Sequence, residues 1–123
     1  MKEVLEILQC QISLGLYEHN LEAEKAYLVG IEITGQRNTF SIEESLYELG
    51  QLAETAGAIT VGKTYQRLKN PQPSTYIGSG KVKEIKFAVE ELEAETVIFD
   101  DELSPAQQRN LERILGTDIK VID

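Results

Sequence analysis

Two glycines flank a serine in the segment whose residue types best suit chemistry, Gly78-Ser79-Gly80-Lys81. The segment follows a polar stretch interrupted by Pro71 and Pro73, and it precedes a helical pattern. Glycine lets another group approach the backbone closely, and Ser79 is expected to cap the following helix. Free N–H groups at a helix start, beside a lysine, attract anions. The segment therefore predicts phosphate-binding residues at Gly78, Ser79, Gly80 and Lys81.

A true nucleoside-triphosphate loop requires more than this turn. That motif has a glycine five residues before its Gly-Lys pair and a Ser or Thr directly after it. Here Thr75 and Val82 occupy those positions. The pattern favours a simpler interpretation, in which the glycines permit a sharp turn between a strand and a helix. A small nucleotide-binding module that uses the turn is kept as an alternative.

Basic residues gather around the turn although the chain as a whole is acidic, with a net charge of −9. Between Lys63 and Lys86, six basic residues face one acidic residue, a net charge of +5 that leaves −14 elsewhere. Lysines near exposed aromatic rings suit phosphate contacts and base stacking. We therefore predict further RNA- or phosphate-binding residues at Lys63, Arg67, Lys69, Tyr76, Lys81 and Lys83. In the alternative, the lysines only solvate a surface, Tyr65 belongs to the sheet core and Tyr76 packs under the glycine turn. For the tyrosines, this alternative is favoured more for Tyr65 than for Tyr76.

Acidic residues follow an apolar run at Asp100, Asp101 and Glu102. Carboxylates beyond the end of a strand are ligands that Mg²⁺ accepts. They are also favourable ahead of the positive end of the next helix. Asp100 and Asp101 are therefore only weak metal candidates, and no metal is assigned. The single histidine has no partner for metal binding or general base catalysis, and no catalytic residue is assigned. We expect no enzyme activity from this chain alone.

Strands alternate with helices along the chain. Strand patterns cover residues 25–33, 58–68, 96–99 and 119–122. Capping signals place helices from Ser41 to Gly57 and from Ser104 to Gly116, and a third helix follows the glycine turn to Leu92. This order, β-α-β-α-β-α-β, predicts a single α/β domain over residues 23–123, with a mostly parallel four-stranded sheet flanked by helices. Residues 1–22 form an N-terminal segment of uncertain structure.

Composition indicates the cellular compartment. No apolar run approaches the roughly 18 residues of a membrane span, and one cysteine gives no internal disulfide. The cytoplasm is therefore expected, with an organelle stroma as the alternative. The oligomeric state is left open.

Two long motifs resemble signatures of the N-terminal domain of HflX-type GTPases. They run from Pro73 to Val82 (PSTYIGSGKV) and from Val97 to Leu111 (VIFDDELSPAQQRNL). The helix Glu43 to Gly57, the strand near Tyr27 to Ile31 and the closing Val121 to Asp123 match in order and spacing. The resemblance covers residues 25–123.

The resemblance implies an accessory domain of a ribosome-associated GTPase. Such a domain contacts ribosomal RNA of the large subunit and modulates the GTPase. A helical hairpin and a GTPase domain are expected to follow residue 123, and GTP and magnesium would belong to that GTPase domain, with no cofactor for this chain. Nucleotide binding by the N-terminal region of some members would fall on Gly78 to Lys81. A further alternative is an interaction domain whose only partner is the GTPase domain.

Overall fold

The computed structural model describes residues 23–35 and 41–123. The uncertain segment 1–22 lies outside the described residues. Four strands form one sheet in the order β2-β1-β3-β4, and each neighbouring pair is parallel. The strands are β1 (Glu24–Ile33), β2 (Ala58–Leu68), β3 (Thr96–Phe99) and β4 (Lys120–Ile122), and the helices are α3 (Ile42–Thr55), α4 (Ser79–Leu92) and α5 (Pro105–Leu115). The predicted α/β class and the order of elements are confirmed.

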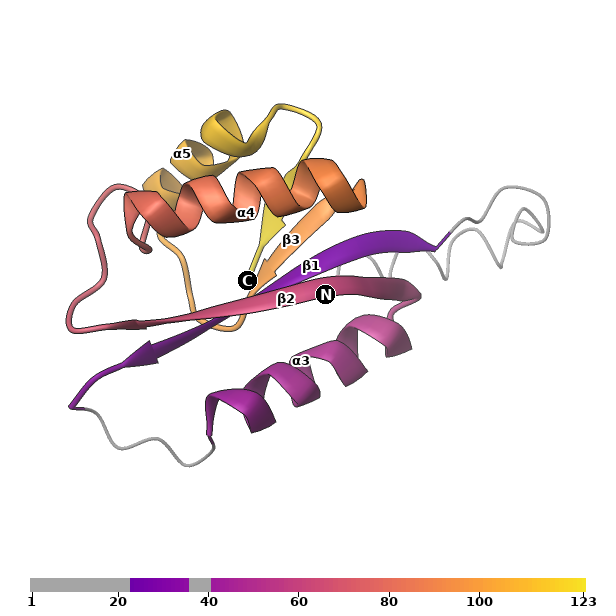
Figure 1. Ribbon diagram of the computed structural model, residues 1–123, viewed down its shortest axis with the longest axis horizontal. Helices are drawn as coiled ribbons and strands as arrows, with labels where there is room; N and C mark the ends of the chain where they lie inside the picture. The colour runs from indigo at the N-terminus through magenta and orange to yellow at the C-terminus, as the bar shows by residue number, and fades with distance from the viewer. Residues whose placement is uncertain (1–22, 36–40) are drawn as a thin grey trace.

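The helices cover the sheet from both sides (Figure 1). Helix α3 lies on one face, and α4 and α5 lie together on the other. The chain passes from β1 to β2 through α3, and then crosses over β1 to reach β3 through α4. The direction of winding therefore reverses at the carboxyl ends of β1 and β3. Open α/β sheets commonly place their binding residues at such a point.

Strand β1 is buried on both faces, as its dense apolar sequence predicts. Tyr27 and Val29 belong to the core under α4 and α5, whereas Ala26 and Leu28 belong to the core under α3. This alternation follows from the two-residue period of a strand. The register of β2 on β1 shifts between Ala26 and Tyr27, so the alternation of faces along β2 is interrupted near Val61.

Helix ends mostly follow their local signals. Ser104 and Gln107 form the complete capping box predicted at the start of α5. Ser41 accepts a hydrogen bond from the Glu44 backbone N–H at the start of α3. Gly57, at φ 93°, follows the end of that helix in a conformation that favours glycine.

The start of α4 differs from the prediction. Gly78, not Ser79, is the N-cap, and Ser79 is the first helical residue. The reason is long-range, because the Gln66 side chain accepts a hydrogen bond from the Gly78 backbone N–H at 3.0 Å. The backbone is thereby anchored one residue earlier than the local sequence indicates.

The apolar side chains of α4 and α5 are not all buried. Val82, Ile85 and Val89 of α4 are buried, whereas Leu92 is 39% exposed. On α5, Leu111 and Leu115 are buried, and Ile114 is 40% exposed. Helical periodicity identifies the side that faces the sheet, but it does not show how far the sheet extends beneath it. Among residues 23–35 and 41–123, no helix combines the length and apolar character that crossing a bilayer requires.

Candidate functional site

The glycine turn lies where β2 passes through a loop into α4. Helix α4 begins with the bond from the Val82 N–H to the Gly78 carbonyl, 3.0 Å long. Gly78 makes no side-chain cap, so the backbone N–H groups of Ser79 and Gly80 face solvent at the positive end of the helix. Exposed donors at a helix start are available to water or to an anion. The turn therefore has donors that an anion could accept, and anion binding by Gly78 to Lys81 stays a prediction.

The surface of α4 is open at Gly80. A methyl group added there would meet no atom of the described residues within 4 Å, and its φ is not positive. Glycine inside a helix costs up to about 1 kcal/mol relative to alanine. The domain therefore leaves space above Gly80 that an outside group could occupy.

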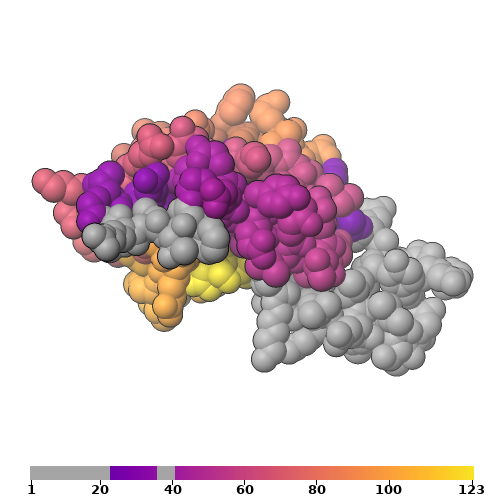
Figure 2. Space-filling model, turned by 90° about the horizontal axis from the view of Figure 1, so that it is seen from below, coloured from indigo at the N-terminus to yellow at the C-terminus, as the bar shows by residue number. Residues whose placement is uncertain are grey.

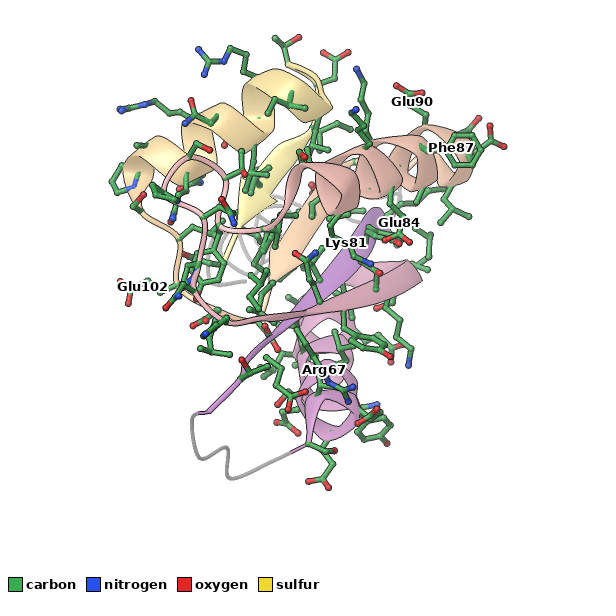
Figure 3. All side chains as sticks on the ribbon, turned by 60° about the vertical axis from the view of Figure 1, so that its left-hand side comes forward. Arg67, Lys81, Glu84, Phe87, Glu90 and Glu102 are labelled. Atoms are coloured by element: carbon green, nitrogen blue, oxygen red, sulfur yellow. The ribbon has the colours of Figure 1, made fainter. Side chains whose placement is uncertain are left out.

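Lys81 is committed to contacts inside the domain. Its Nζ lies 3.2 Å from Thr64 Oγ1 and forms an ion pair with Glu84. The hydrogen bond from Lys81 holds the pKa of the Glu84 carboxyl below its usual value. Only 18% of the Lys81 side chain is exposed. Figure 3 shows Lys81 and Glu84 meeting between α4 and β2.

The cations of β2 lie on the opposite face of the strand from Lys81. Lys63 and Arg67 alternate with the half-buried Thr64 and Gln66, which contact α4. They are exposed because β2 is an edge strand and α3 covers only part of its face. The basic residues that the sequence groups together are therefore divided between the two faces of β2.

Arg67 is paired within the domain. Its Nε donates to Glu32 Oε2 at 2.9 Å, and this contact raises the pKa of the guanidinium. Its guanidinium carbon also lies 5.8 Å from the centre of the Tyr65 ring. In contrast, Lys63, Lys69 and Lys83 are exposed and form no ion pair with any described residue.

Tyr65 and Tyr76 differ in exposure in the opposite sense to the one that the sequence favours. Tyr65 is 46% exposed, so its assignment to the sheet core is wrong. Tyr76 is buried and its hydroxyl donates to the Asp101 carboxylate. Burial of the ring is the main reason that the pKa of Tyr76 is raised. Of the two rings, Tyr65 is the one that can offer a stacking surface.

The loop before the turn is held by polar side chains that local patterns did not single out. Gln72 and Tyr76 exchange two backbone hydrogen bonds of 2.9 Å. From α5, Gln107 Nε2 donates to the Gln72 carbonyl at 2.8 Å, and Asn110 Nδ2 donates to the Ser74 carbonyl at 2.9 Å. Gln107 thus serves both the cap of α5 and this loop. Its capping position was readable from the sequence, but its second contact joins residues 35 apart.

The carboxylates after β3 accept hydrogen bonds from the protein itself. Asp100 Oδ1 accepts from the Ile31 backbone N–H at 2.9 Å, and burial raises the pKa of the Asp100 carboxyl. Asp101 accepts from Tyr76 and from the Glu102 backbone N–H. Within residues 23–35 and 41–123, no three metal-ligating side chains converge. The weak metal candidates therefore gain no third ligand there.

A hollow of about 470 Å³ lies beside these carboxylates on the α3 side of the sheet. Its lining residues are Leu49, Leu52, Phe99, Asp100, Asp101, Glu102 and Asp123. The hollow combines an apolar wall from α3 with an acidic rim. Such a rim disfavours phosphate, and the hollow is therefore distinct in character from the glycine turn.

Comparison with known proteins assigns the class of this domain. The model of the family described as "GTP-binding GTPase N-terminal" matches residues 43–123. The chain belongs to this family, as an N-terminal domain of the HflX type.

Three relatives illustrate the match, each named GTPase HflX. The protein of Flavobacterium psychrophilum is 38% identical over 108 residues, which cover 88% of this chain and 25% of the relative. That of Lacrimispora saccharolytica is 44% identical over 100 residues, covering 81% and 22%. That of Escherichia coli is 39% identical over 100 residues, with the same coverage. The chain thus spans about a quarter of the length of these relatives.

Proposed function

We propose that this domain is the accessory N-terminal domain of an HflX-type GTPase in the cytoplasm. In this proposal, the domain contacts ribosomal RNA of the large ribosomal subunit. It also modulates the GTPase domain of the same protein. The observation that carries the RNA contact is a set of exposed cations along the β2 edge and on α4 that form no ion pair with any described residue, namely Lys63, Lys69 and Lys83. Lysines of this kind bind phosphates and release counterions.

The turn adds donors that do not depend on side-chain charge. The N–H groups of Ser79 and Gly80 are directed outward from the start of α4, and the space above Gly80 is open. A phosphate of the RNA backbone can approach these groups without displacing a side chain. Lys81 then contributes by holding α4 against β2 through Thr64 and Glu84.

The edge position of β2 allows one RNA strand to reach both groups of cations. Lys63 lies on the α3 side of the edge and Lys83 lies on α4. The exposed ring of Tyr65, on the same face of β2 as Lys63, offers a surface for a base. The strongly acidic remainder of the chain repels phosphate and thereby restricts contact to this edge.

Co-sedimentation with purified large ribosomal subunits over a salt series tests the proposal. The triple variant Lys63→Glu/Lys69→Glu/Lys83→Glu is expected to lose binding, and the wild type is expected to bind less as salt rises. Arg109→Glu on α5 introduces a charge reversal far from β2 and serves as the control. Equal pelleting of the triple variant and the wild type would refute contact at this edge.

Nucleotide binding at the turn is a second candidate, favoured by the uncapped start of α4. The turn would bind the phosphates of a nucleotide as it would bind those of RNA. The base and ribose of the nucleotide, however, could contact only the β2 edge. Calorimetric titration with ATP and with GTP distinguishes the two candidates. Heat that disappears in Gly80→Trp, without loss of binding to large subunits, would assign the turn to a free nucleotide.

A further inference from the structure

Helix α4 carries a row of exposed side chains on the side that faces away from the sheet. Ile85 and Val89 are buried, and a step of two residues turns an α-helix by about 200°. Phe87, which lies two residues from each of them, therefore points outward, and it is 67% exposed. Lys83 and Glu91 stand one turn before and one turn after Phe87, and both are exposed. Side chains at this four-residue spacing form one ridge of a helix.

A second pair of charges, Lys86 and Glu90, stands beside this ridge. Both side chains are exposed, and Figure 3 shows Phe87 and Glu90 directed away from the sheet. Lys81 and Leu92, in contrast, contact β2 and take no part in this surface. We name the following five residues the outer surface of α4: Lys83, Lys86, Phe87, Glu90 and Glu91.

The four charges of the outer surface are arranged against the dipole of their own helix. The lysines precede Phe87 and the glutamates follow it, with no acidic residue in the first turn of α4 and no basic residue in the last. A helix favours the opposite distribution, because its N-terminus is positive and its C-terminus is negative. None of the four forms an ion pair with any described residue, including Lys86 and Glu90, which are four residues apart. The described domain therefore does not compensate these charges.

A second copy of the helix, placed antiparallel, complements both ends of this surface at once. Phe87 lies midway between Lys83 and Glu91, so a twofold axis beside Phe87 brings the lysines of each copy against the glutamates of the other. The glutamates of each copy then lie toward the positive end of the other helix, which favours them. A partner that is only cationic or only anionic would be attracted by one end of the surface and repelled by the other. The charge pattern therefore selects a second copy.

We infer that two copies of this chain associate through the outer surface of α4 as an antiparallel, twofold-symmetric dimer. Phe87 of one copy packs against Phe87 of the other, and aromatic pairs gain more than their buried area alone provides. Lys83 meets Glu91 and Lys86 meets Glu90 across the axis. The same residues thus serve on both copies, as in other twofold dimers. One helix face buries less than the roughly 1,200 Å² of a stable interface, so the dimer is weak, with a Kd on the order of 0.1–1 mM.

Lys83 belongs both to this surface and to the proposed RNA contact. The dimer covers this lysine, so RNA and a second copy compete for it. Self-association is measured without RNA. It can therefore fail while the ribosomal contact holds, or hold while that contact fails.

Charge exchange tests the dimer by sedimentation equilibrium at chain concentrations up to about 1 mM. Lys83→Glu/Lys86→Glu leaves only acidic charges on the outer surface, and Glu90→Lys/Glu91→Lys leaves only basic ones. Each variant alone is expected to weaken self-association about tenfold, because like charges then face each other. An equimolar mixture of the two variants is expected to associate again. The variant with all four exchanges keeps the net charge of −9 and is expected to associate as the wild type does.

The control for net charge lies on α3, on the other face of the sheet. Glu48→Lys/Glu54→Lys changes two exposed glutamates and therefore changes the net charge as much as Glu90→Lys/Glu91→Lys does. Figure 2 shows the molecule from below the view of Figure 1, with α3 in magenta on the near side. This control is expected to leave self-association as strong as in the wild type.

Phe87 and Tyr47 provide a matched pair for the aromatic contact, because each is 67% exposed and they lie on opposite faces of the sheet. Phe87→Ser is expected to weaken self-association about tenfold, whereas Tyr47→Ser leaves it within about twofold. Circular dichroism checks that each variant is folded.

Three outcomes would overturn the dimer. One is a wild type that stays monomeric at about 1 mM; if a single-stranded RNA oligonucleotide then binds the wild type but not Phe87→Ser, the surface belongs to RNA instead. Another is a mixture of the two charge-reversed variants that associates no better than either variant alone. The third is self-association that is kept in Phe87→Ser and lost in Tyr47→Ser, which would place the contact on α3.

Discussion

The Tyr76 hydroxyl donates a hydrogen bond to the Asp101 carboxylate, and this contact joins the loop before α4 to the loop after β3. Tyr76 adopts a left-handed backbone conformation at φ 69°, which is uncommon for a bulky residue. Backbone bonds with Gln72 hold it in this conformation. The position of the glycine turn therefore depends on Asp101, which follows β3, the strand that comes after α4 in the chain.

Removing the Tyr76 hydroxyl is expected to lower the free energy of unfolding. Tyr76→Phe leaves the Asp101 carboxylate with one fewer donor in a partly buried site, which costs about 1–2 kcal/mol. Urea unfolding followed by circular dichroism measures the change. Tyr47→Phe, at an exposed ring, is the control and is expected to change stability by less than about 0.5 kcal/mol. Equal effects of both variants would contradict this role of Tyr76.

Two glycines are expected to respond to alanine in opposite directions. At Gly30, a Cβ would lie 2.9 Å from Leu46 Cγ, so Gly30→Ala is expected to destabilise the domain by about 1–3 kcal/mol. At Gly50, inside α3, a Cβ would make an ordinary contact of 3.6 Å with Leu28. Gly50→Ala is therefore expected to stabilise the domain by about 0.5–1 kcal/mol. Thermal unfolding measures both, and a loss of stability in Gly50→Ala would count against the packing described.

The carboxyl of Asp100 makes stability depend on pH. Burial raises its pKa in the folded state, so folding favours the protonated form. Its stabilising contribution is full below the unfolded-state pKa and is lost as pH rises through the folded-state pKa. Asp100→Asn retains an oxygen acceptor for the Ile31 N–H and removes the charge. We expect Asp100→Asn to increase the free energy of unfolding at pH 7.

That gain is expected to disappear near pH 3, where Asp100 is protonated in both states. Urea unfolding at the two pH values measures the difference between Asp100→Asn and the wild type. Asp118→Asn, which removes a carboxylate at an exposed position, is measured beside it as the control. A gain that is the same at both pH values would rule out burial of the charge as its cause.

Lys81 and Lys83 are expected to separate stability from RNA contact. Lys81→Met breaks the ion pair with Glu84 and should destabilise the domain by less than about 1 kcal/mol, since Glu84 is half exposed. Lys83→Met removes an exposed cation and should leave unfolding unchanged. Its effect is expected on large-subunit binding, where the slope against the logarithm of salt concentration falls by about 1. The reverse pattern would place the RNA contact on Lys81.

Local sequence patterns predicted the elements and their order well. The capping box of Ser104 and Gln107 appears as expected, and strands β2 and β3 have the predicted bounds. The parallel sheet also follows from alternating strands and helices. These features arise from interactions within a few residues, or from a periodicity that a short window contains.

The tertiary structure alone decided how the candidate site is arranged. The sequence determined that cations surround the glycine turn, but the face of β2 that each occupies depends on pairing with β1 and on how far α3 extends. The exposure of Tyr65 likewise follows from the edge position of β2, whereas Tyr76 is buried in the core under α4 and α5 and bonds to Asp101 after β3. The contact of Lys81 with Thr64 spans 17 residues of sequence. Contacts of this kind form only when the crossover brings α4 onto the sheet. A local sequence pattern does not predict them, because it does not specify which strand becomes the edge.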